Sequence, residues 1–306
     1  MKIIFFGTPD YVIPVVEALN KSFRTRNENG VVAVVTQPPR PIGRGHKIDR
    51  SEVDHWAYKH KISILYDFDN LPQADIGVVA AYGKIIPKHV INHFPLGILN
   101  IHPSLLPKYR GASPVQAAIT SGETQTGVTV IKMDELMDHG AIVSSFKDEI
   151  LKADTSETLR DRLFEKSAKF IVDLIPNYLK GKIKLKEQVH NDATFTKLLT
   201  REHGFINPVY LKEAIEGETS KKNWKIQYIK DYSQVPDVNS IERFIRAMAP
   251  WPGAWTTVTL QNDQRRLKIL SSHIEDKKLV FDKVQMEGKD PVSWEEFKRG
   301  YPKISF

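Results

Sequence analysis

Residues 3–10 read Ile-Ile-Phe-Phe-Gly-Thr-Pro-Asp, and this stretch decides the class of fold. Four apolar residues that end at a glycine are typical of a strand buried on both faces, as in a parallel sheet. Thr8 and Pro9 then form a helix-start signal, with the threonine as N-cap and the proline at the first helical position. Pro14 falls inside this helix, where we expect it to kink or tighten the helix. A strand, a glycine turn and a helix therefore open the chain.

The alternation of strands and helices continues to about residue 180. Further strands are expected at 31–35, 77–81, 96–101, 127–133 and 141–149, and helices at 51–61, 85–92, 113–122 and 155–179. Short strands that alternate with helices predict an α/β fold with an open, mostly parallel sheet. The turn at Gly7 lacks the GxGxxG pattern of a dinucleotide site, so we expect no NAD site there.

The pattern changes after residue 180. Lysines alternate with apolar residues from Lys180 to Lys186, which predicts a strand with one cationic face. Farther along, the sequence predicts a helix at 241–249 and short strands at 255–260, 266–271 and 278–282. These patterns divide the chain into a first domain (1–180), a basic linker (181–206) and a smaller β-rich C-terminal domain (207–306).

Length and composition narrow the class of protein. The 306 residues suggest two domains, because a domain usually has ~100–200 residues. Cysteine is absent, which excludes disulfides, a thiolate nucleophile and Cys-ligated metal, and the ten histidines follow no metal-binding spacing. No apolar run approaches a membrane span and no signal peptide precedes the first strand, so we expect a cytoplasmic protein. The net charge of +7 favours a polyanionic partner, but charge alone leaves RNA binding open.

The residues with the clearest chemistry lie in the stretch 99–111, Leu-Asn-Ile-His-Pro-Ser-Leu-Leu-Pro-Lys-Tyr-Arg-Gly. Asn100 and His102 are two residues apart at the end of an expected strand, so both side chains point to the same side. Pro103 favours the extended conformation of the residue before it. An amide that donates and an imidazole that accepts a proton can together polarise a carbonyl and deprotonate its attacker. A hydrogen-bonded structural histidine is the alternative.

Asp138 is a third candidate, in a loop between two expected strands. Its carboxylate could orient His102 and stabilise the charged imidazole. The alternative is an aspartate that serves the turn before Gly140.

Several of these residues together resemble the signature of the folate-dependent formyltransferases: Asn100, His102, the run Ser104–Pro107, Gly111 and Asp138. Other stretches resemble the branch of this family that acts on methionine esterified to initiator tRNA, namely 7–10, 36–45, 81–87 and 245–252. The resemblance covers most of residues 1–190 and resumes at 240–260. It implies a Rossmann-like first domain and an OB-like barrel at the C-terminal end.

The resemblance also implies the reaction and its residues. The formyl donor is 10-formyltetrahydrofolate, a cosubstrate, and the acceptor is the α-amine of methionyl initiator tRNA. Asn100, His102 and Asp138 match the catalytic residues. The positions implied in folate binding are Ser104, Leu105, Leu106, Pro107, Tyr82 and Ile85, and those implied in tRNA binding are Arg40, Arg44 and Lys47. We expect a monomer, with no metal and no membrane partner.

The sequence departs from the family in its C-terminal part, and alternatives remain open. Residues 207–239 are longer than the usual join before the 241–252 segment, and the stretch after Ser271 is short of a barrel strand. One alternative is a formyltransferase for an amino sugar nucleotide, which would need neither the barrel nor the basic loop that carries Arg40, Arg44 and Lys47. The others are hydrolysis of formyl-folate and a non-enzymatic RNA-binding protein on the same scaffold.

Overall fold

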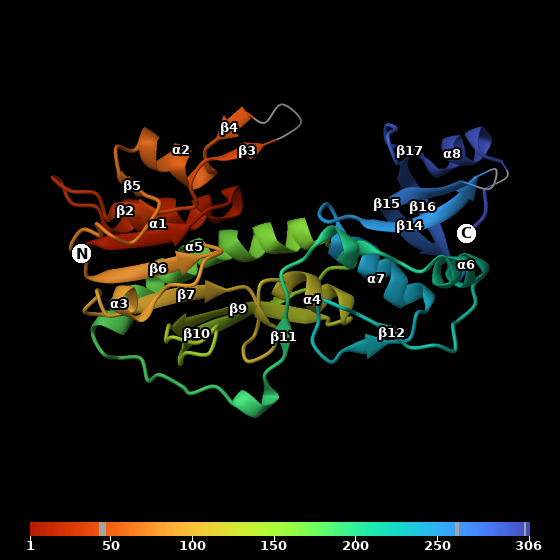
Figure 1. Ribbon diagram of the computed structural model, residues 1–306. Helices are drawn as coiled ribbons and strands as arrows, with labels where there is room; N and C mark the ends of the chain where they lie inside the picture. The colour runs from red at the N-terminus through yellow and green to blue at the C-terminus, as the bar shows by residue number, and fades with distance from the viewer. Residues whose placement is uncertain (43–46, 261–262, 303) are drawn as a thin grey trace. The chain divides into compact units, whose positions relative to one another are not determined.

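The computed structural model describes residues 1–42, 47–260, 263–302 and 304–306 (Figure 1). They form two compact units. The first unit consists of Met1–Arg110, Thr126–Asp148 and Arg160–Ala193, and the second of Gly111–Gln125, Glu149–Leu159 and Thr194–Phe306.

A seven-stranded sheet of order β10-β9-β7-β6-β1-β2-β5 forms the centre of the first unit. Its strands are β1 (Ile3–Gly7), β2 (Val31–Val35), β5 (Ser63–Leu65), β6 (Ile76–Ala80), β7 (Ile98–His102), β9 (Gln125–Lys132) and β10 (Ile142–Glu149). The five strands from β7 to β5 are parallel, and β9 is antiparallel to β7. The predicted open, mostly parallel α/β sheet is confirmed.

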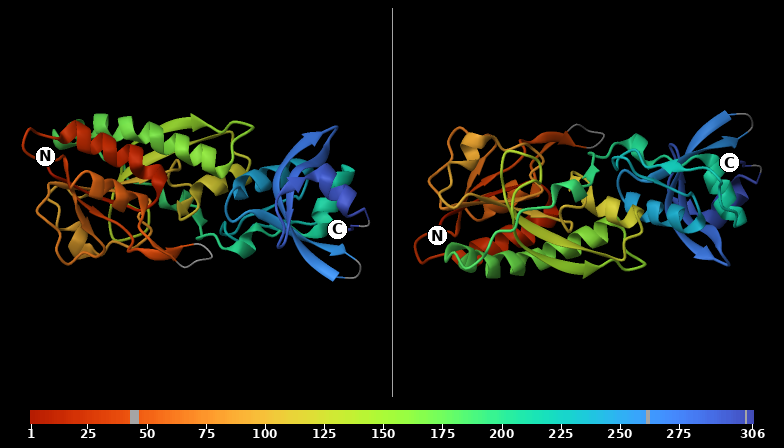
Figure 2. Two further views of the ribbon diagram at one scale, coloured as in Figure 1. Left: turned by 90° about the horizontal axis from the view of Figure 1, so that it is seen from above. Right: turned by 90° about the horizontal axis from the view of Figure 1, so that it is seen from below.

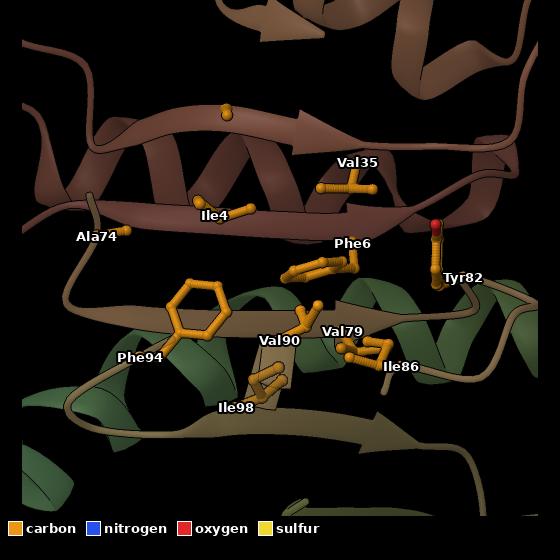
Figure 3. Packing of buried hydrophobic residues seen from close by; sticks show 11 residues of the cluster. Ile4, Phe6, Val35, Ala74, Val79, Tyr82, Ile86, Val90, Phe94 and Ile98 are labelled. Atoms are coloured by element: carbon orange, nitrogen blue, oxygen red, sulfur yellow. The ribbon is translucent and has the colours of Figure 1, made fainter. Parts of the chain in front are cut away.

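Both faces of this sheet are covered, which explains why β1 has no exposed residue. Helices α1 (Ile13–Phe23) and α5 (Ser156–Leu179) run side by side along one face (Figure 2). Alternate residues of the strands face a hydrophobic cluster on the other side, where Phe6 lies against Tyr82 and Phe94 (Figure 3). The cluster consists of Ile4, Phe6, Ala33, Val35, Ala74, Val79, Tyr82, Ile86, Val90, Phe94 and Ile98.

The first helix begins later than the sequence predicts. A 3-10 turn (Asp10–Val12) follows Pro9, and α1 starts at Ile13. Pro14 therefore lies in the first turn of α1, where a proline breaks no helical hydrogen bond, so the expected kink inside the helix is wrong. The tight 3-10 turn lies just before it, at Asp10–Val12. The Thr8 hydroxyl does not cap the helix but donates to the Tyr82 carbonyl oxygen at 3.2 Å.

The cationic strand expected from Lys180 to Lys186 is also wrong. Residues 180–186, all of which the structure describes, form no strand, and only Lys186 makes a β-bridge, to Ile142. Gly181 turns the chain at the end of α5 with a φ of +62°, which breaks the extended conformation that the alternation requires.

The second unit is β-rich, as predicted. Its sheet has the order β14-β15-β16-β17 and is antiparallel throughout. The strands are β14 (Ala254–Leu260), β15 (Asp263–Glu275), β16 (Lys278–Met286) and β17 (Val292–Ser293), and the helices are α4 (Pro114–Thr120), α6 (Pro208–Glu216), α7 (Val238–Met248) and α8 (Trp294–Gly300). Ser305 adds an antiparallel bridge to Thr259 on β14.

Several side chains of residues 207–239 are buried in the second unit. Tyr228 is fully buried, and its hydroxyl lies 2.6 Å from Thr120 Oγ1 and 3.1 Å from the Gln116 carbonyl oxygen on α4. The ring of Trp224 packs on Phe244 of α7, with centroids 4.6 Å apart. The extra length of this segment therefore fills space between α4 and α7.

Short elements complete the fold. They are β3 (Arg40–Ile42), β4 (Lys47–Asp49), α2 (Glu52–Lys59), α3 (Lys88–Ile91), β8 (Arg110–Gly111), β11 (Phe195–Thr196), β12 (Trp224–Lys225) and β13 (Ser233–Gln234), with 3-10 turns at His190–Asp192 and Arg201–Gly204. Among the described residues, no helix combines the length and the apolar character that crossing a membrane requires. The same part of the chain contains no group of three or more His, Asp or Glu that could hold a metal ion.

Candidate active site

The candidate site lies at the end of β7, at the carboxyl edge of the parallel strands. Ile98 faces the hydrophobic cluster, so Asn100 and His102, two and four residues later, project to the same face. The neighbouring strand ends are tied together there, because Thr8 Oγ1 and Gln37 Nε2 both donate to the Tyr82 carbonyl oxygen. Open α/β sheets bind ligands at this edge, where strand order reverses.

The structure brings Asn100, His102 and Asp138 together. Asn100 Nδ2 donates to Asp138 Oδ1 at 3.1 Å. The same carboxylate oxygen lies 3.5 Å from His102 Nδ1. Only 5% of the His102 side chain and 12% of the Asp138 side chain are exposed, so water screens their interaction weakly. An amide, an imidazole and a carboxylate therefore lie side by side, with His102 buried and Asn100 and Asp138 partly exposed.

The second nitrogen of His102 defines the state of the ring. Nε2 lies 3.0 Å from the Tyr109 carbonyl oxygen, which can only accept a hydrogen bond. The neutral imidazole therefore carries its proton on Nε2, and its free electron pair is on Nδ1. That nitrogen faces Asp138, so a proton accepted there would lie between the ring and the carboxylate.

Two residues beside the imidazole have left-handed backbone. The φ of Tyr109 is +61° and that of Asp138 is +50°. Aspartate adopts this region with several-fold higher frequency than most residues, but a bulky tyrosine there costs on the order of 1–3 kcal/mol. Backbone strain of this kind persists only where neighbouring groups hold the residue in place. At Tyr109 the strained backbone supplies the carbonyl oxygen that contacts His102.

The loop after His102 is attached to β9 by one hydroxyl. Thr129 is buried, its Oγ1 donates to the Ser104 carbonyl oxygen at 2.7 Å, and it accepts from the Leu106 N–H at 3.1 Å. Ser104 Oγ closes the loop by donating to the Lys108 carbonyl oxygen at 2.6 Å. Within the loop, Ser104 and Leu106 are buried, whereas Leu105 and Pro107 are partly exposed.

Replacing Thr129 with valine should therefore destabilise the first unit. Valine has the same shape, but it leaves two buried backbone groups of the loop without a partner, at a cost of about 1–3 kcal/mol. Chemical denaturation measures this loss in the free energy of unfolding. The exposed Thr124→Val is the control, with an expected change within about 0.5 kcal/mol. Equal stability of the two variants would contradict the assignment of this hydroxyl.

Tyr82 and Ile85 lie in different surroundings. Tyr82 is only 2% exposed, and burial, with a smaller contribution from Asp67, raises the pKa of its hydroxyl to about 12. The hydroxyl stays protonated at neutral pH and has no hydrogen-bond partner among the described residues. Ile85, by contrast, is 87% exposed.

The predicted basic loop is described only in part. Arg40 is exposed on the hairpin of β3 and β4 and donates to Gln37 Oε1. Lys47 begins the second strand of this hairpin, and Arg44 lies outside the described residues. Arg50, another cation of this stretch, lies 3.6 Å from the buried Asp54 carboxylate.

Sequence reasoning missed two residues that support the site. Arg110 is buried and donates through Nε and Nη2 to Gln188 Oε1, at 3.2 and 2.7 Å. Gln188 in turn donates to the carbonyl oxygens of Asp138 and Gly140. No local pattern connects residues 78 positions apart, so spacing could not have found this pair.

Taken together, these groups suit acyl transfer to a nucleophile that must lose a proton. The amide of Asn100 has a second N–H for an oxygen that becomes anionic, and His102 Nδ1 can accept a proton. Asp138 lies against both side chains and compensates the positive charge that the imidazole would gain.

Comparison with known proteins identifies close relatives of this chain. The formyl transferase family model matches residues 1–175, and the model of the formyl transferase C-terminal domain matches residues 236–280. A methionyl-tRNA formyltransferase of Chloroflexus aggregans is 37% identical over 266 residues, which cover 84% of this chain and 76% of the relative.

Solved structures share the fold. The methionyl-tRNA formyltransferase from Clostridium thermocellum matches with a TM-score of 0.56 at 19% identity, over 94% of this chain and 98% of the other. An N-formyltransferase from Helicobacter canadensis, in complex with folinic acid and dTDP-3-aminofucose, matches with a TM-score of 0.63 at 16% identity, over 96% and 98%. At these identities the likeness concerns the fold alone.

Proposed function

This chain belongs to the formyl transferase family, and from that premise we propose that it transfers the formyl group of 10-formyltetrahydrofolate to the α-amine of methionyl initiator tRNA. The observation that carries this proposal is that Asn100 and Asp138 meet the buried imidazole of His102. The name of the 37% identical relative supports methionyl-tRNA as the acceptor.

The reaction moves a formyl group from one nitrogen to another. The α-amine attacks the formyl carbon, whose oxygen becomes anionic, and the bond from that carbon to N10 of the folate then breaks. A free α-amine has a pKa near 8 and must be neutral to attack, so a base that works near neutral pH suits the step.

Each residue of the trio has one role in this proposal. Asn100 donates its second N–H to the formyl oxygen as the negative charge develops, a contact worth roughly 3–4 kcal/mol. His102 accepts the amine proton at Nδ1, directly or through water, and returns a proton to N10 as it leaves. Asp138 orients the imidazole and stabilises its charged form.

The loop beside the trio and the end of β6 are the proposed folate-binding surface. Leu105, Pro107 and the strongly exposed Ile85 offer apolar contacts for a flat ring system, and the buried Ser104 and Leu106 fix the loop. The unpaired Tyr82 hydroxyl supports a polar contact, because a buried donor without a partner is costly unless a ligand supplies one.

Arg40, Lys47 and Arg44 are the proposed contacts to the acceptor end of the tRNA. If each of these three cations neutralises one phosphate, the affinity for tRNA should fall about 20- to 40-fold as salt rises from about 50 to about 200 mM. Arg40→Ala should reduce the slope of log affinity against log salt by about 1, as measured by filter binding.

Lys21 provides the matched control for that measurement. It is exposed near the end of α1, which leads away from the carboxyl edge of the sheet. Lys21→Ala should leave the slope unchanged. An affinity that stays flat with salt would contradict a phosphate-binding loop.

The organisation that we propose follows this chemistry. Residues 1–180 act as the catalytic domain, 181–206 as a basic linker, and 207–306 as an atypical tRNA-binding domain. The protein works as a monomer in the cytoplasm, where initiator tRNA is used, and needs no metal.

One experiment separates this proposal from its alternatives. The purified protein is given 10-formyltetrahydrofolate with initiator methionyl-tRNA, with an amino sugar nucleotide, or with neither. Formyl transfer to methionyl-tRNA alone is the expected result. Transfer to the sugar alone would overturn the acceptor, and release of formate without an acceptor would indicate a hydrolase. Binding of tRNA with no turnover would indicate a non-catalytic RNA-binding protein.

A further inference from the structure

The side chain of Gln188 uses all its hydrogen-bonding capacity inside the first unit. It is 5% exposed. Its Nε2 donates to the carbonyl oxygens of Asp138 at 2.9 Å and Gly140 at 2.8 Å. Its Oε1 accepts from Nε and Nη2 of Arg110. Two donors and two lone pairs are thus all satisfied.

The partners of Gln188 fix the direction of its amide. A guanidinium can only donate and a backbone carbonyl can only accept, so the amide oxygen must face Arg110 and the nitrogen must face the 138–140 loop. The reversed amide would place donors against donors and acceptors against acceptors. The Gln188 side chain therefore holds Arg110 and the 138–140 loop at a fixed separation.

These contacts reach both sides of His102. On the Nδ1 side, Asp138 is held through its own carbonyl group by Gln188. On the Nε2 side, the accepting carbonyl belongs to Tyr109, the residue directly before Arg110. Gln188 therefore connects the two chain segments that contact the two ring nitrogens.

Both segments need such support. Tyr109 and Asp138 have left-handed φ angles, which the surroundings must maintain. Arg110 is itself anchored, because Nη2 also lies 2.8 Å from His190 Nδ1. Burial lowers the pKa of the Arg110 guanidinium while Asp138 and Asp134 act in the opposite direction, and the side chain remains charged at neutral pH.

We propose that Gln188 is a positioning residue for formyl transfer, which holds the Asp138 carboxylate and the Tyr109 carbonyl on either side of His102. This inference rests on the proposed function for its catalytic consequence. Its structural part, the attachment of the 138–140 loop, stands independently and is tested separately.

The sharpest variant is Gln188→Glu. The carboxylate has the same size and keeps a partner for Arg110, but it cannot donate to the two loop carbonyls. The expected kcat is about 10- to 100-fold lower, with KM for both substrates within about twofold, because misplaced catalytic groups lower the rate without weakening binding. Glu187→Gln, at the exposed neighbouring position, is the control and should match the wild type.

Hydrogen exchange followed by mass spectrometry tests the attachment without any substrate. In Gln188→Glu and in Gln188→Ala, residues 134–141 should exchange faster while β1 and β6 exchange as in the wild type. Unchanged exchange in 134–141 would overturn the attachment. Faster exchange throughout the first unit would show a general structural role and would also overturn the proposal.

A double-variant cycle tests whether Gln188 acts through Asp138. Asp138→Asn keeps a residue that tolerates left-handed φ but removes the carboxylate charge. In that background Gln188→Glu should cause no further loss of kcat, whereas an independent role would multiply the two losses. If the wild type transfers no formyl group to methionyl-tRNA but the loop still exchanges faster in the variants, the proposed function fails and the attachment stands.

Discussion

Replacing His102 with alanine should lower kcat about 10²- to 10⁴-fold, which is the usual contribution of a positioned general base. The imidazole is buried, has its free electron pair at Nδ1 and lies 3.5 Å from the Asp138 carboxylate. Without the imidazole, the proton of the attacking amine has no acceptor, and the Asp138 carboxylate has no positively charged ring to stabilise. Single-turnover formylation of methionyl-tRNA at saturating substrate measures this loss.

Two further variants make the result interpretable. His102→Gln keeps a donor for the Tyr109 carbonyl group but cannot accept a proton near neutral pH, so it should lose as much activity as the alanine variant. The exposed His55→Ala should stay within about twofold of the wild type. Undiminished turnover in His102→Ala would overturn the mechanism.

Replacing Asn100 with aspartate should lower kcat about 10²- to 10³-fold. The change keeps the size of the side chain but removes the N–H that the formyl oxygen requires. It also places a second carboxyl group at the position from which Nδ2 now contacts Asp138 Oδ1, at 3.1 Å. Two carboxylates at this distance cannot both stay ionised, so the variant should retain a shared proton.

The control for this change is Asn92→Asp, at an exposed position after α3. It alters charge in the same way and should leave kcat unchanged. Asn100→Ala tests the oxyanion role without the added charge and should show a loss of the same order. If Asn100→Ala were fully active, the formyl oxygen would have another donor.

Much of the fold could be predicted from local pattern. The apolar runs at 3–6 and 96–101 predict buried strands, and the structure contains both, as Ile3–Gly7 and Ile98–His102. Local rules failed where a tertiary partner competed with them. Thr8 donates to the Tyr82 carbonyl group instead of capping a helix, and the lysines after Lys180 meet no neighbouring strand until Lys186.

The candidate site was likewise predictable from the local sequence only in part. The sequence by itself determined that Asn100 and His102 lie on one face, because the alternation of side chains in a strand involves only neighbouring residues. Only the tertiary structure decided which nitrogen of His102 faces Asp138, and it alone revealed Arg110 and Gln188 behind the site. Gln188 contacts residues 50 and 78 positions away, and contacts of that range depend on how the whole unit packs rather than on any local spacing.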